Sequence, residues 1–269
     1  PAGRSPVSGY YDFRRRELQI TSGRRDLPRE RKPWGVAWGR PIAYSILQHE
    51  LVHAVVASLL GSGDLFTATT QLRLTGMQLP IAMTVVRLPD GRLWLLSPIT
   101  PDAGLLEAVA AKGEVAYIVA PNSFHHLFVQ PWAARFPDAQ LWASPGLREK
   151  RPDLAFAGIH GDGREPWSDA IASIAIAGAP KVGETVFFHR ASRTLVVTEL
   201  LFNIHRTEGF FTPWILRMMG VYRRLGQSRV WRLLTKDRSA AAASARAVLG
   251  LGAQRVVFAH GDVIDALPE

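Results

Sequence analysis

Four ionisable side chains of this 269-residue chain stand directly after apolar segments. They are His125, His126, Glu199 and His260. The sequence contains no cysteine, so a metal site on this chain would use imidazole and carboxylate ligands, both of which zinc accepts. An ion held in this way polarises an ester or phosphoester and lowers the pKa of a bound water molecule. These residue types could therefore take part in metal chemistry.

The segments before these residues have the composition of buried strands. The run 115–120 is apolar throughout, and the runs 195–199 and 255–260 follow the same plan. A weaker version, 156–162, ends in His-Gly-Asp. Strands that are buried on both faces and end in polar loops present chemistry at the carboxyl edge of a sheet. We therefore expect one site that is assembled from several loops.

The rest of the chain after residue 64 alternates between strand-like and helix-like segments. Hairpins are predicted over 83–97, with a turn at Pro89-Asp-Gly, and over 184–199. The region 205–236 is basic and aromatic, and it fits a solvated helix face, a lid over the site or a surface for an acidic partner. We also expect helices over 101–112, 127–135 and 239–251, strands over 65–74, 136–143 and 170–177, and a loop over 144–152.

A second arrangement with catalytic spacing lies near the N-terminus. His49-Glu-Leu-Val-His53 falls within the apolar segment 41–63, for which we expect a helix. The spacing places both imidazoles on one helix face, with Glu50 available as a general base, and it resembles the zinc helix of metallopeptidases. No third ligand follows at a recognisable spacing, and polar residues interrupt the segment too often for a membrane span. An amphipathic helix that docks on the main domain or on a partner is the alternative.

The positive charge of the chain is concentrated in its first 40 residues. Ten basic and four acidic residues there give +6 of the formal net charge of +9. Without a nucleic-acid motif or interleaved aromatic residues, we expect a solvated and irregular arm, with a short strand near 17–21, rather than a nucleic-acid interface. We find no signal-peptide pattern, so we expect a cytoplasmic protein.

Five motifs in order resemble those of an uncharacterised bacterial family, a domain of unknown function that is itself similar to the metallo-β-lactamase fold. The resemblance covers roughly residues 64–265. It implies a four-layer αββα sandwich of the α/β class, with a zinc site at one edge. The motifs are Met83-Thr-Val-Val-Arg-Leu-Pro-Asp-Gly, Ala120-Pro-Asn-Ser-Phe-His-His-Leu, Phe187-Phe-His-Arg-Ala-Ser-Arg-Thr-Leu, Leu200-Leu-Phe-Asn and Ala259-His-Gly-Asp.

The resemblance also implies which residues would bind the metal. The superfamily motif Thr-His-x-His-x-Asp-His falls on residues 120–126, where His126 matches the last histidine and His125 stands in the place of the aspartate. Pro121 and Ser123 occupy the places of the first two histidines. A further histidine ligand is expected near residues 178–180, which contain none.

The bridging aspartate of the superfamily falls on Glu199, and the final histidine falls on His260. The resemblance thus implies one zinc ion on His126, Glu199 and His260. It leaves His125 or Asp262 to orient a ligand or to move a proton. His160, His189 and His205 are the remaining histidines outside residues 41–63; they fit a turn, a hairpin and a position beside the ligands, respectively.

We therefore divide the chain into a basic arm at 1–40, a helix at 41–63 and a metallo-β-lactamase-like domain at 64–269. The leading hypothesis is a mononuclear metal-dependent hydrolase that acts on a small ester or phosphoester. The second is a non-catalytic member of the fold that binds a ligand or partner at the same edge. The third is a zinc peptidase that uses the residues His49, Glu50 and His53.

Overall fold

The computed structural model describes residues 9–12, 17–20, 60–74 and 77–265. The chain divides into two compact units, Pro1–Pro41 and Ile42–Glu269. In the first unit, β1 (Gly9–Asp12) pairs antiparallel with β2 (Glu17–Ile20). The strand expected near 17–21 is therefore present, and it has a partner that the sequence did not predict. The remaining description concerns the second unit.

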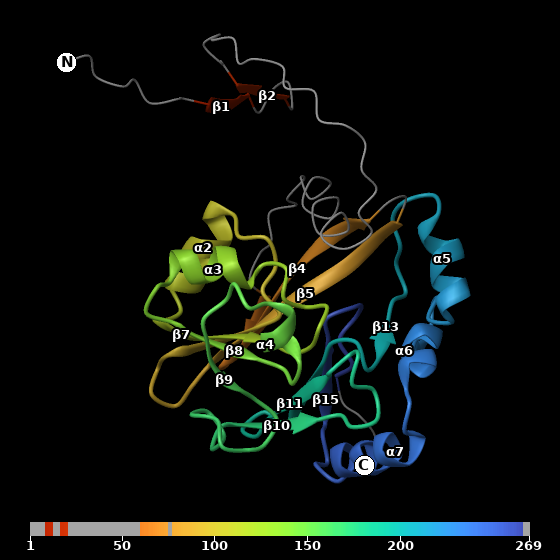
Figure 1. Cartoon of the computed structure of the whole chain (residues 1–269). Coiled ribbons are helices and arrows are strands. Elements are labelled where there is room, and N and C mark those ends of the chain that lie inside the picture. Colours follow the sequence, from red (N-terminus) through yellow and green to blue (C-terminus); the bar gives the residue numbers. More distant parts are fainter. Residues whose placement is uncertain (1–8, 13–16, 21–59, 75–76, 266–269) are drawn as a thin grey trace, which may run out of the picture. The chain divides into compact units, whose positions relative to one another are not determined.

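Two β-sheets form the centre of this unit (Figure 1). The larger sheet has seven strands in sequence order, antiparallel from β3 to β6 and parallel from β6 to β9. Its strands are β3 (Leu60–Ser62), β4 (Leu65–Leu74), β5 (Met77–Arg87), β6 (Leu93–Leu96), β7 (Val115–Ala120), β8 (Gln140–Ala143) and β9 (Phe156–Ile159).

The smaller sheet has the order β10-β11-β12-β15. Its first three strands are antiparallel, whereas β12 and β15 run parallel. They are β10 (Ile171–Ala175), β11 (Thr185–His189), β12 (Thr194–Val197) and β15 (Arg255–Phe258), and a separate short pair consists of β13 (Phe202–Asn203) and β14 (Leu225–Gly226). Both predicted hairpins, β5–β6 and β11–β12, are present.

Helices complete the unit, and α2 and α3 lie on the larger sheet while α7 lies beyond the smaller one (Figure 1). The region expected to be helical over 205–236 is interrupted, because Gly220 at φ 77° ends α5 and β14 follows. None of the described helices is long and apolar enough to cross a membrane. The helices are α2 (Ala103–Ala110), α3 (Val129–Arg135), α4 (Leu147–Lys150, in the predicted loop), α5 (Thr212–Met219), α6 (Arg229–Leu234) and α7 (Arg238–Leu249).

Alternation of side chains along the strands creates the layers. In β6, Leu93 and Leu95 belong to the core that contains α2 and α3, whereas Trp94 and Leu96 belong to the core between the sheets. In β12, Val196 faces that same intersheet core, and its two neighbours face the core that contains residues of α6 and α7. Successive side chains of a strand point to opposite faces, so strands that are apolar throughout need cover on both sides. The predicted αββα sandwich is confirmed.

Aromatic packing joins the two sheets. Trp94 is fully buried, and its ring centroid lies 5.0 Å from that of Phe187 and 5.9 Å from that of Trp167, both in edge-to-face geometry. The ring of Trp167 also contacts Tyr117 at 5.0 Å. This cluster fixes the separation of the sheets and hence the relative positions of the loops at their edges.

Truncation of this cluster should destabilise the whole unit. We expect Trp94→Ala to lower the free energy of unfolding by about 3–5 kcal/mol, because a large aromatic side chain leaves a cavity that the rigid sheets cannot fill. Urea denaturation followed by circular dichroism measures the change. Leu249→Ala, at a residue that is 79% exposed, is the control and should have little effect. Equal losses in the two variants would contradict this account of the core.

Candidate metal centre

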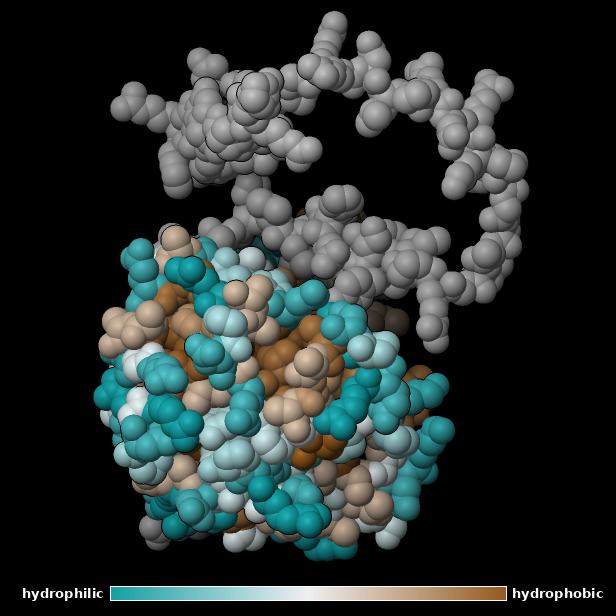
Figure 2. All heavy atoms as spheres, turned by 60° about the vertical axis from the view of Figure 1, so that its left-hand side comes forward, coloured by the Kyte–Doolittle hydropathy of each residue, from teal (hydrophilic) through white to brown (hydrophobic). Residues whose placement is uncertain are grey.

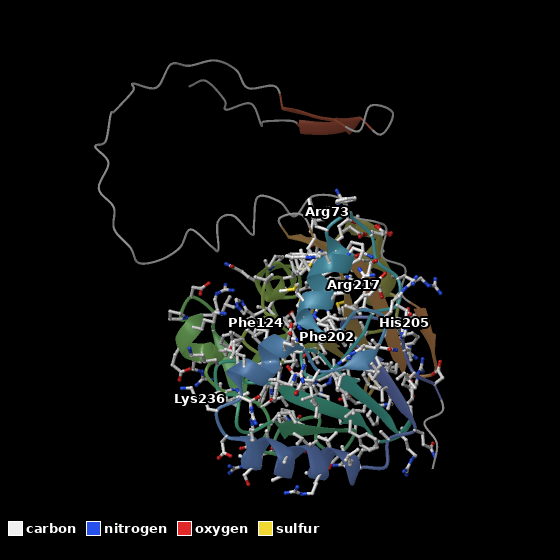
Figure 3. The ribbon with its side chains drawn as sticks, turned by 90° about the vertical axis from the view of Figure 1, so that its right-hand side faces the viewer. Arg73, Phe124, Phe202, His205, Arg217 and Lys236 are labelled. Carbon is white, nitrogen blue, oxygen red and sulfur yellow. The ribbon has the colours of Figure 1, made fainter. Side chains whose placement is uncertain are left out.

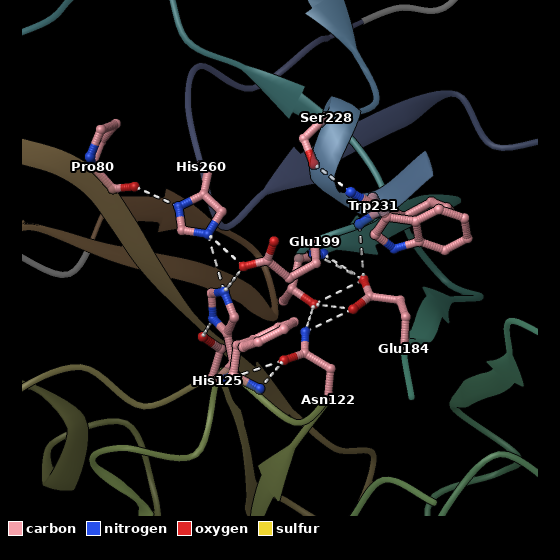
Figure 4. A network of polar contacts seen from close by, with 12 residues as sticks. Pro80, Asn122, His125, Glu184, Glu199, Ser228, Trp231 and His260 are labelled. Atoms are coloured by element: carbon pink, nitrogen blue, oxygen red, sulfur yellow. Dashed lines mark hydrogen bonds and ion pairs between the residues drawn. The ribbon is translucent and has the colours of Figure 1, made fainter. Parts of the chain in front are cut away.

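Three loops that follow strands bring two histidines and a glutamate together (Figure 4). His125 lies in the loop after β7, Glu199 lies two residues after β12, and His260 lies two residues after β15. Because β12 and β15 are parallel neighbours, their carboxyl ends lie at the same edge of the smaller sheet. The loop after β7 reaches this edge from the larger sheet, so the group spans both layers.

The ligand-type atoms of this group are close enough to share one ion. The two Nε2 atoms of His125 and His260 are 3.0 Å apart, and the Oε1 atom of Glu199 lies 3.2 Å and 3.3 Å from them, respectively. Metal–ligand bonds of 2.0–2.2 Å with tetrahedral angles would place ligand atoms roughly 3.3 Å apart. The three residues therefore fit a zinc-type ion and leave a fourth position open.

Outer hydrogen bonds hold both imidazoles in this orientation. The Nδ1 of His260 lies 2.8 Å from the carbonyl oxygen of Pro80. A carbonyl only accepts, so Nδ1 donates, which fixes the orientation of the ring with Nε2 toward the other two residues of the group. The Nδ1 of His125 lies 2.6 Å from the Oγ of Ser97. Ser97 is buried at φ 53°, a conformation that is costly for a residue other than glycine.

Burial and charge favour the protonation states that metal binding requires. Burial lowers the pKa of His125, and the neighbouring His260 acts in the same direction, although Glu199 opposes them. Burial alone would raise the pKa of Glu199, but the contacts with the side chains of His125 and His260 outweigh it and hold this pKa below its usual range. A neutral imidazole beside a carboxylate is the combination that binds a divalent cation.

A second, fully buried carboxylate connects the loops that carry these ligands. The Oε1 of Glu184 accepts from the backbone nitrogens of Thr198, Glu199 and Leu200 at 3.1, 3.0 and 3.3 Å, and both its oxygens lie within reach of the Thr198 hydroxyl. Its Oε2 accepts from the Nδ2 of Asn122 at 2.7 Å. Burial raises the pKa of Glu184 to about 7, although the Asn122 hydrogen bond acts in the opposite direction.

Asn122 carries this connection to His125. Its Oδ1 accepts from the backbone nitrogens of Phe124 and His125 at 2.8 and 2.9 Å, and its side chain is fully buried. One chain of hydrogen bonds thus runs from the backbone of His125 through Asn122 and Glu184 to the backbone of Glu199. It fixes two of the three ligand-bearing residues relative to each other.

Glycine allows the third ligand to approach. Gly261 has φ 120°, and a Cβ atom at this position would lie 2.1 Å from the carbonyl oxygen of Asn203. The nitrogen of Asn203 donates to the carbonyl oxygen of His260 at 3.0 Å. The residue after His260 therefore has to be glycine for β13 to pack against this loop.

The structure brings His125, rather than the adjacent His126, together with Glu199 and His260. The Nδ1 of His126 instead lies 3.1 Å from a guanidinium nitrogen of Arg151. Burial and the nearby charges of Lys150 and Arg151 lower the pKa of His126 to about 4. The structure thus groups His125, which was expected to orient a ligand, with Glu199 and His260, and it places His126, the expected ligand, outside that group.

Asp262 lies near the group but outside it. The residue is exposed. Its backbone nitrogen donates to the carbonyl oxygen of Asn203 at 2.9 Å, and its carbonyl oxygen accepts from the Nδ2 of Asn203 at 2.7 Å. Its predicted role in proton transfer remains a prediction.

The other histidines of the described residues take part in separate contacts. The Nε2 of His160 lies 2.9 Å from the carbonyl oxygen of Ala120, His189 contacts the Ser192 hydroxyl, and His205 contacts the side chain of Asn203. The residues of the predicted peptidase motif, His49, Glu50 and His53, lie outside the described part of the chain.

Sequence reasoning missed the residues that support the ligands. Asn122 lies inside the motif that drew attention to the histidines, and a buried asparagine that follows a strand is a signal for loop capping. Glu184 is the first residue of a predicted hairpin and has no local feature that distinguishes it from an exposed residue. Ser97 was predicted only as the last residue of a hairpin, and its contact with His125 was not predicted.

Removal of the Asn122 side chain should destabilise the site and the fold together. We expect Asn122→Ala to lower the free energy of unfolding by about 2–4 kcal/mol, because two backbone N–H groups lose their acceptor and Glu184 loses a donor. Urea denaturation measures this loss. Gln140→Ala, which truncates an exposed amide on β8, is the control. A loss no larger than that of the control would show that the network is not required.

Several solved structures share the fold. The metallo-β-lactamase DIM-1 matches with a TM-score of 0.56 and 15% identity, over 78% of this chain and 91% of that chain. A metallo-β-lactamase from Pontibacter korlensis matches with a TM-score of 0.55 and 12% identity, over 78% and 93%. The Flv1 flavodiiron core from Synechocystis matches with a TM-score of 0.55 and 11% identity, over 78% and 57%.

Sequence comparison supplies the family. No curated protein matches this sequence. The family described as a domain of unknown function, DUF4336, matches residues 63–210, which is more than half of the chain and includes His125 and Glu199. The chain therefore belongs to the DUF4336 family, and its fold is like that of the metallo-β-lactamases.

Proposed function

We propose that this protein is a metal-dependent hydrolase that holds one ion on His125, Glu199 and His260 and acts on an ester or phosphoester. The observation that carries the proposal is the convergence of two imidazole nitrogens and one carboxylate oxygen at separations of 3.0–3.3 Å. His125 takes the place that the sequence gave to His126. A bound ion would supply Lewis acidity and acidify a water molecule.

The residues around the group would perform defined parts of the reaction. Pro80 and Ser97 fix the two rings, so the imidazoles bind rather than move protons. Glu199, whose side chain is 20% exposed, marks the side from which water and substrate reach the group. Asp262, two residues from His260 and exposed, is the proposed group for moving a proton.

Charge near the site favours an anionic substrate. The Nζ of Lys150 donates to the carbonyl oxygen of Ser123 at 2.5 Å, and it lies 5.7 Å from the ring centroid of Phe124. Ser123 and Phe124 directly precede His125, and Arg151 follows Lys150 in sequence. Arg151 is paired with Asp153 at 2.6 Å, so Lys150 is the cation beside this loop that supports a phosphoester over a neutral ester.

A single ion is proposed because the residues for a second set are missing. Pro121 and Ser123 stand where the superfamily motif has its first two histidines. Among the described residues, His125, Glu199 and His260 are the one group of at least three histidine or carboxylate residues with this proximity.

Adjacent histidines provide a matched test of metal binding. We expect purified protein to retain close to one equivalent of zinc, and His125→Ala to weaken binding by at least about 100-fold, because loss of a ligand costs more than the 10–100-fold typical of supporting residues. His126→Ala should keep the metal. Elemental analysis measures the metal content of each protein, and competition with a chelator measures its metal affinity. Circular dichroism confirms that each variant is folded.

Hydrolysis of p-nitrophenyl phosphate and p-nitrophenyl acetate should then follow metal content, and it should be lost in His125→Ala. Metal that is lost in His126→Ala but retained in His125→Ala would contradict the proposed ligands. Metal binding without turnover of either ester class would overturn the enzymatic proposal and favour the non-catalytic alternative. Absence of metal from folded wild-type protein would overturn both the proposed metal site and the proposed hydrolase activity.

A further inference from the structure

A cavity separate from the candidate metal centre lies between α6, α7 and β10. Its volume is about 460 Å³, within the range of small-molecule sites. None of the three proposed metal ligands lines it. In Figure 3 the blue helices α6 and α7 face the viewer, and Lys236, which lies between them in sequence, is labelled. Leu200, which directly follows Glu199, is among the lining residues, so the cavity adjoins the loop that carries Glu199.

The cavity combines an apolar wall with basic and polar groups. Helix α7 contributes three alanines, whose small side chains leave the space open. The lining residues are Ile176, Leu200, Gln227, Trp231, Arg232, Thr235, Arg238, Ala241, Ala242 and Ala245. No carboxylate is among them, so the lining carries only positive charge.

Two guanidinium groups supply that charge. Arg232 and Arg238 are exposed at the surface of α6 and α7, and neither guanidinium forms a hydrogen bond or ion pair with another described residue. Elsewhere on this chain, arginines such as Arg92 and Arg164 pair with a nearby aspartate. The cavity therefore offers two cations that are free to bind an anion.

The ring of Trp231 adds to the apolar wall of the cavity. The residue is only 4% exposed, and its Nε1 is fully buried. The nearby Thr235 hydroxyl is engaged with the carbonyl oxygen of Trp231. The two arginines are therefore the groups of the lining that can bind an anion.

We propose that the cavity binds a small organic anion with an apolar body. The body would pack against Ile176, Leu200 and the alanines of α7, while the anionic group would accept from the two arginines. This chemistry includes acyl carboxylates and sulfonates. The proposal stands on the cavity, its apolar wall and its charge, and it does not depend on a metal.

Two probes that share an apolar body test the charge requirement. The full-length protein would be titrated with the anion 1-anilinonaphthalene-8-sulfonate and with neutral N-phenyl-1-naphthylamine, and fluorescence would be followed. We expect one saturable site for the anion with an affinity at least tenfold higher than that for the neutral probe, in line with two charge-assisted contacts. Equal affinities, or binding without saturation, would overturn the proposal.

Variants locate the binding. Ala242→Trp fills the cavity from an exposed helix position and should abolish anion binding. The double variant Arg232→Gln/Arg238→Gln should weaken anion binding at least tenfold and leave the neutral probe unaffected. Arg246→Gln, an exposed arginine of α7 outside the lining, is the matched control and should bind as the wild type does. Anion binding that survives Ala242→Trp in folded protein would place the site elsewhere.

Discussion

The geometry of the candidate centre depends on one buried carboxylate. Glu184 accepts hydrogen bonds from the backbone after β12 and from Asn122 after β7, and Asn122 in turn holds the backbone of His125. These two loops belong to different sheets, so neither sheet alone could set their separation. A carboxylate suits this place because both of its oxygens accept hydrogen bonds, and together they can accept from several donors at once. The cost of burying it is offset by these donors.

The sandwich supplies the frame for this connection. Side chains that alternate along β6 and β12 face different layers, and the intersheet aromatic cluster around Trp94 sets the distance between the sheets. Parallel pairing of β12 with β15 then brings the loops of Glu199 and His260 to one edge. The apolar strands thus determine where the loops meet, and the buried polar network determines how the side chains point within that region.

The sequence predicted the frame better than the side-chain directions. Apolar strands followed by histidine or carboxylate indicated a site at a sheet edge, and the pairing of Glu199 with His260 agrees with that expectation. The choice between His125 and His126 could not be made from the pattern, because the two residues are adjacent in an irregular turn. The hydrogen bonds that the backbone of this turn donates to Asn122 decide which ring points inward. The partners of Glu184 are distant in sequence, so only the folded chain reveals its role.

X-ray absorption spectroscopy at the zinc edge of the purified, zinc-loaded protein tests the central claim most directly. The account predicts two imidazole ligands, with their characteristic multiple scattering, and oxygen ligands from Glu199 and solvent, all at about 2.0–2.2 Å. In His125→Ala protein the imidazole contribution should fall to that of one ring. A wild-type spectrum without two imidazoles, or one that His125→Ala leaves unchanged, would contradict the assignment of His125, Glu199 and His260 as the metal ligands.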